Sequence, residues 1–148
     1  MLIQSLHIIF KTELLKLKTE IEMYQQESNL WQNQNGTLNA AGNLCLHLIG
    51  NLNTYIGVGL AKTDYIRQRD LEFSLRDVPR TQLLDMITQT ILVVENGLDN
   101  LTEDDFSADF PIVIWDTPTT TGYTLIQLAT HLKYHLGQIN YHRKLFDR

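Results

Sequence analysis

The chain has 148 residues, 43% of them hydrophobic and 20% charged, which is the balance of a globular domain of ordinary size. Its formal net charge of −5 and the mixing of Lys with Glu near the amino terminus argue against nucleic acid as a partner, because phosphate binding needs clustered Lys and Arg. No run reaches the roughly 20 apolar residues that cross a bilayer, so no membrane association is expected.

The single cysteine, Cys45, lies in an apolar run between two leucines. It is interpreted as a buried small hydrophobic residue and not as a nucleophile. One cysteine cannot form an intrachain disulfide, and the amino terminus lacks the pattern of a signal peptide, so we expect a cytoplasmic protein.

The first half of the chain predicts two helices joined by a loop. Apolar residues recur at steps of three and four over residues 3–24, which is typical of an amphipathic helix. The polar stretch 25–39 has no such period and predicts a loop, from which Trp31 should pack back on the helices. Residues 40–57 are apolar nearly all round, so the second helix should lie in the interior and end near Gly57.

The connections on either side of the third helix are long. A charged connection is predicted over 62–77, and Pro79 should open a third helix that ends near Gly97. The next connection, 101–122, contains the β-prone run 111–115. That run predicts one short extended segment and no sheet, because no partner strand is apparent.

The fourth helix is predicted to begin near Thr124, whose spacing to Gln127 fits a capping box, and to run nearly to the carboxyl terminus. There is no internal repeat and no linker long enough to divide the chain. The sequence therefore predicts one all-α domain over residues 1–148, a four-helix bundle with long crossover connections.

Two histidines of the fourth helix, His131 and His135, are four residues apart and so share one helix face. On a helical wheel they lie between an apolar stripe and a second group formed by Tyr134, Tyr141 and Leu145. Both histidines are therefore predicted to point into the bundle.

Buried imidazoles need partners, and a metal ion supplies one by accepting a lone pair from each neutral ring. His47 of the second helix is the candidate third ligand, and Asn51, one turn further on the same face, is a candidate for orienting a ligand. Three histidines with an open position are a catalytic metal pattern. The alternative is that the histidines only bond one another. His142 lies about 10 Å further along the helix and is interpreted as a terminal or interface histidine.

Three segments, 42–52, 67–73 and 131–139, resemble the DinB-like (YfiT-like) superfamily of metal-dependent four-helix-bundle proteins, and the resemblance covers essentially the whole chain. It implies a four-helix bundle with a long crossover and a three-histidine metal site. Nickel and zinc are the ions that it implies, and homodimers are common in that superfamily. Some relatives are transferases or isomerases that use a low-molecular-weight thiol such as bacillithiol or mycothiol, and many others have no assigned activity.

On that resemblance the ligands fall on His47, His131 and His135. The first functional hypothesis is a metal-dependent thiol S-transferase, or a related hydrolase or isomerase, in which Arg67 or Arg69 binds a carboxylate of the thiol or of its electrophilic substrate. The second is a non-catalytic metal-binding or protein-interaction bundle. The third is a structural bundle that holds no metal.

Overall fold

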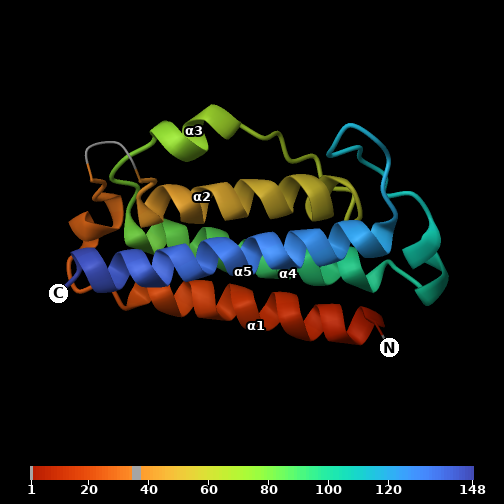
Figure 1. Cartoon of the computed structure of the whole chain (residues 1–148), viewed down its shortest axis with the longest axis horizontal. Coiled ribbons are helices and arrows are strands. Elements are labelled where there is room, and N and C mark those ends of the chain that lie inside the picture. Colours follow the sequence, from red (N-terminus) through yellow and green to blue (C-terminus); the bar gives the residue numbers. More distant parts are fainter. Residues whose placement is uncertain (1, 35–37) are drawn as a thin grey trace.

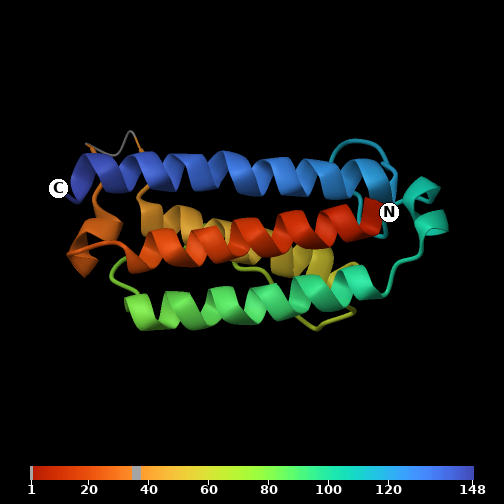
Figure 2. The same ribbon diagram turned by 90° about the horizontal axis from the view of Figure 1, so that it is seen from below.

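Four long helices lie side by side along the molecule in the computed structural model, which describes residues 2–34 and 38–148 (Figures 1 and 2). These helices are α1 (Leu2–Glu22), α2 (Ala41–Leu52), α4 (Arg80–Asp99) and α5 (Thr121–Phe146). Both α1 and α2 pack against α4 and α5, so the four form a closed ring around one core. The prediction of an all-α four-helix bundle is confirmed.

The direction of the helices explains the long connection between α2 and α4. Figure 1 shows α1 and α5 running one way along the bundle and α2 and α4 running the other way. Because α2 and α4 are parallel, residues 59–79 must return along the length of the molecule, and they carry the short helix α3 (Arg69–Ser74) across α2. The other long connection, 100–120, contains the 3₁₀ helix η3 (Glu103–Ser107) and stays at one end. Only the first connection is therefore a crossover.

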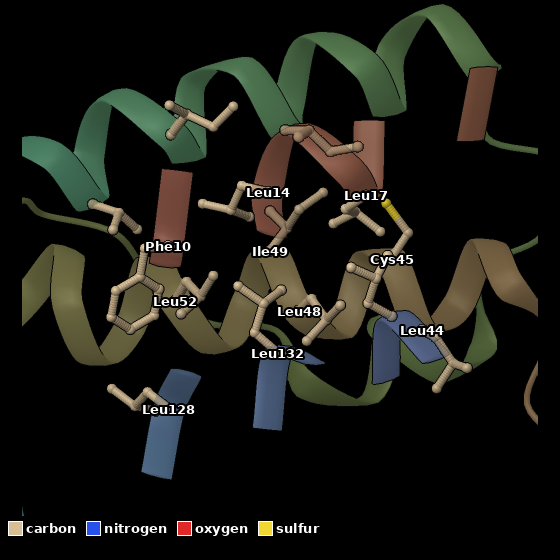
Figure 3. Close-up of a cluster of buried hydrophobic side chains, with 14 of the residues drawn as sticks. Phe10, Leu14, Leu17, Leu44, Cys45, Leu48, Ile49, Leu52, Leu128 and Leu132 are labelled. Carbon is tan, nitrogen blue, oxygen red and sulfur yellow. The ribbon is translucent and has the colours of Figure 1, made fainter. Parts of the chain in front are cut away.

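The core follows from the apolar stripes of the helices. All twelve residues of α2 are buried, because α3 covers the side that the other long helices leave open. Figure 3 shows Leu14 and Leu17 of α1, Leu48 of α2 and Leu132 of α5 gathered in one cluster. Beyond α2 the chain continues in a π-helical turn, η2 (Asn53–Val58), close to the predicted helix end. Within the described ranges, no helix has the length and apolar character needed to cross a membrane.

The last helix begins three residues earlier than predicted. Thr120 is its N-cap, and its hydroxyl oxygen accepts a hydrogen bond from the backbone N–H of Tyr123 at 3.3 Å. Thr124 already lies in the first turn, where its hydroxyl donates to the backbone oxygen of Thr120 at 2.8 Å. The predicted capping box of Thr124 and Gln127 is therefore wrong.

The β-prone run 111–115 forms no strand in the part of the chain that the structure describes. Its flanks pair instead, through an isolated antiparallel bridge between Asp109 and Thr120. The backbone N–H of Phe110 donates to the oxygen of Thr119 at 2.8 Å beside this bridge. The run is thus a loop closed at its base, because no neighbouring strand is present to accept its remaining backbone groups.

The loop after α1 is anchored on the bundle, as expected for Trp31, which is 8% exposed at the end of the 3₁₀ helix η1 (Glu27–Trp31). His142 holds the same loop: its Nδ1 accepts from the Tyr24 hydroxyl at 2.7 Å, and its Nε2 donates to the backbone oxygen of Gln32 at 2.7 Å. Of the two interpretations of His142, the terminal one fits, because the residue lies near the end of α5 and both of its ring nitrogens are used inside the chain.

Cys45 is completely buried among core side chains, as predicted. Burial raises the pKa of its thiol to about 12, because the thiolate would lose its hydration there. Cys45 is therefore a core residue and not a nucleophile.

Candidate metal centre

The bundle brings the three predicted histidines together where α2 passes α5. The Nε2 atom of His131 lies 3.2 Å from Nε2 of His47 and 3.0 Å from Nε2 of His135. Each ring offers one nitrogen to the same point, and these atoms all lie within 4.8 Å of one another. Such a cluster is able to hold a metal ion.

The protonation of the two outer rings follows from their second nitrogens. Nδ1 of His47 donates to Oε1 of Glu72 at 3.1 Å, and Nδ1 of His135 donates to Oε1 of Gln138 at 2.6 Å. A neutral imidazole carries only one N–H, so both rings present a bare lone pair on Nε2. These two lone pairs face the third ring.

His131 cannot satisfy both neighbours in either neutral form. If its Nε2 carries a proton, only one of the two neighbouring lone pairs can accept it. If its Nε2 carries a lone pair, this lone pair faces the lone pairs of both neighbours. Its Nδ1 is buried and has no hydrogen-bond partner among the described residues. Burial, and then charge repulsion from His135 and His47, lowers the pKa of His131 to about 4. Near neutral pH the ring therefore does not take up the second proton that would make both of its nitrogens donors.

A divalent metal ion fits this arrangement because it accepts all three Nε2 lone pairs at once. Two imidazole nitrogens bound to one tetrahedral ion at about 2.1 Å lie roughly 3.4 Å apart, close to the spacing of the Nε2 atoms here. A tetrahedral ion with three histidine ligands keeps its fourth position for another group.

Glu72 of α3 fixes His47, and the sequence reasoning did not single it out. Its carboxylate is 6% exposed and binds the Arg67 guanidinium in bidentate fashion, Nε to Oε2 and Nη2 to Oε1, each at 2.9 Å. Oε1 also accepts from His47, so the chain carries a carboxylate–histidine pair of the kind that orients metal ligands. Burial lowers the pKa of His47 in spite of this hydrogen bond, which keeps the ring neutral and able to donate a lone pair.

Gly50 provides the space that Glu72 occupies. A Cβ atom built on Gly50 would lie 1.9 Å from Oε2 of Glu72 and 2.7 Å from its Cδ. A carboxylate can therefore approach α2 only where this helix has no side chain. The glycine lies three residues after His47, so α2 supplies both the ligand and the room for the group that orients it.

The site lies at the edge of the bundle and not at its centre. His47 is 6% exposed, whereas His131 and His135 are only half-buried. Tyr134 and Tyr141, which the helical wheel placed on the inward face, are 64% and 70% exposed. That part of the prediction is wrong, because the side of α5 that carries these tyrosines faces solvent. Leu145 is likewise exposed.

A pocket of about 380 Å³ opens beside His47 and His131. The three residues that the sequence suggested beyond the histidines line it: Asn51, Arg67 and Arg69. Arg67 is bound to Glu72. Asn51 is 8% exposed, and its Oδ1 has no hydrogen-bond partner in the described part of the chain. No hydrogen bond joins Asn51 to a histidine among the described residues.

Fold and site together define a helical-bundle protein with a three-histidine centre able to hold a metal ion and with a pocket beside it. The chain belongs to the family described as "Protein of unknown function (DUF1572)", whose model matches residues 6–148. Comparisons with curated proteins and with solved structures gave no match.

Proposed function

We propose that this protein is a metal-dependent enzyme of the DinB-like superfamily, a thiol S-transferase or a related hydrolase or isomerase, with His47, His131 and His135 as ligands of nickel or zinc. The observation that supports it is the convergence of three Nε2 atoms, two of them bare lone pairs by hydrogen bonding, beside an open pocket. Imidazole ligands suit both ions.

A bound divalent ion supplies Lewis acidity and lowers the pKa of a thiol or water at its open position. The side chains around the histidines fix the protonation of two of the ligands. Glu72 keeps the proton of His47 on Nδ1, and Gln138 does the same for His135, so these two ligands need no change of tautomer on binding.

The composition of the pocket favours a thiol over water as the nucleophile. No Asp or Glu lines it in the part of the chain that the structure describes, so no carboxylate is placed to take a proton from water. A free thiol has a pKa of about 8.5 and loses its proton with far less help. A small-molecule thiol is needed because Cys45 is buried.

The test is metal-dependent consumption of a thiol. Protein loaded with nickel or zinc should accelerate the reaction of monochlorobimane with a cellular thiol such as bacillithiol or cysteine, and the chelated protein should not. The rate should fall by about 100-fold or more in His131→Ala, since the variant loses a ligand of the activating ion. A protein that binds metal but accelerates no thiol would support the non-catalytic metal-binding bundle in its place.

The homodimer and the cytoplasmic location expected from the sequence stay predictions. Each has its own measurement, light scattering for the first and fractionation of cells for the second.

A further inference from the structure

The pocket beside the histidines carries a charge opposite to that of the chain. The formal net charge is −5, yet Arg67 and Arg69 both line this pocket, and none of its lining residues in the described ranges is acidic. A small molecule that enters it therefore meets positive charge in an otherwise acidic protein.

The two arginines do different things. Arg67 is held in place: one edge of its guanidinium, Nε and Nη2, binds both oxygens of the Glu72 carboxylate, and its Cζ lies 5.8 Å from the centre of the Tyr55 ring. Its charge is thus largely neutralised. Arg69 is exposed, and no acidic side chain of the described residues lies within ion-pair distance of it. It is the cation of this pocket that is available to a ligand.

Asn51 is a second polar group without a partner at the same place. Its side chain is more than nine-tenths buried, and its Oδ1 lacks the hydrogen bond that burial demands. A ligand with an N–H or O–H group would supply that bond. Trp115, 43% exposed, and Leu128 give the pocket apolar walls.

We infer that this pocket binds a small carboxylate that also carries an N–H or O–H donor, with Arg69 as the residue that selects for the negative charge. A planar guanidinium matches a carboxylate in bidentate fashion. A carboxylate fits better than a phosphate, because one available arginine balances one negative charge. The inference rests on the proposed function only in placing this ligand beside the metal centre, since Arg69 and Asn51 are part of the chain whether or not an ion is bound.

The experiment compares two probes of nearly the same shape, the anion N-(4-fluorobenzoyl)glycine and its neutral primary amide. Both carry the same N–H donor and the same flat ring. Their dissociation constants are measured by ¹⁹F NMR on the full chain, in chelated and in metal-loaded form, at low ionic strength. The carboxylate should bind about tenfold tighter than the amide to both forms.

Arg69→Gln should abolish that preference while leaving the amide unchanged, and Arg148→Gln, which removes one charge at the end of the chain, should leave both constants unchanged. Equal binding of the two probes by the wild-type protein would overturn the inference. So would a carboxylate preference that survives in Arg69→Gln, because the metal or another group would then hold the anion. Metal content is measured on the same samples. A protein that takes up no metal on loading but still prefers the carboxylate refutes the proposed function and leaves the subsite standing.

Discussion

Removal of the metal should lower the melting temperature of this protein by about 10 °C. An ion that binds only the folded state stabilises it by about 4 kcal/mol when its concentration is about 1,000 times the dissociation constant, and a chain of this size gains roughly 2–4 °C per kcal/mol. Scanning calorimetry of the loaded protein, with and without a chelator, measures the difference. The matched control is His131→Ala with His135→Ala, whose melting temperature should not respond to the chelator.

The pH dependence of that shift follows from the histidines. The pKa of His131 is about 4 in the folded chain against an ordinary 6.5, so the unfolded chain takes up the proton first as the pH falls. Stability is therefore full above about pH 6.5 and decreases toward pH 4, even without metal. The loaded protein should lose stability faster over the same range, because protons compete for the Nε2 lone pairs. A chelator effect as large at pH 4 as at pH 7 would contradict this account of the site.

Gly50→Ala should weaken metal binding by about 10- to 100-fold while leaving the metal-free fold intact. The new methyl group would occupy the position of the Glu72 carboxylate, which must then move away from His47. A glycine-to-alanine change inside a helix otherwise gains up to about 1 kcal/mol of stability. Competition with a fluorescent chelator gives the affinity, and chemical denaturation of the chelated protein gives the stability.

Gly137→Ala is the control for that experiment. A Cβ atom on this residue of α5 meets nothing within 4 Å, so the variant should gain helix stability and keep the metal affinity of the wild-type protein. If both alanine variants bind metal as tightly as the wild-type protein, the role given to Glu72 is wrong.

Periodicity was sufficient to predict the bundle. The four long helices bury their apolar stripes as the pattern of three and four residues indicates, and α2, apolar all round, is the buried one. The convergence of the three histidines was predictable as well, because His131 and His135 share a helix face and His47 lies on a helix that has no exposed side.

Other features depend on tertiary contacts that no local pattern carries. Glu72 lies in a charged connection that looks like solvent-exposed chain, and only the crossover places it against Gly50. The sequence signal for this contact is Gly50, a glycine in the middle of an apolar helix and three residues after the candidate ligand His47. The exposure of Tyr134 and Tyr141 was mispredicted because a wheel shows which residues share a face and not how many neighbours that face has.

The most direct test of the central claim is the metal content of the protein by inductively coupled plasma mass spectrometry. The protein is purified without a histidine tag and compared with the double variant His131→Ala, His135→Ala. The wild-type protein should hold close to one equivalent of a transition metal, nickel or zinc, and the variant should hold none. Wild-type protein that holds no metal even after incubation with either ion, or a variant that holds as much as the wild type, would contradict it.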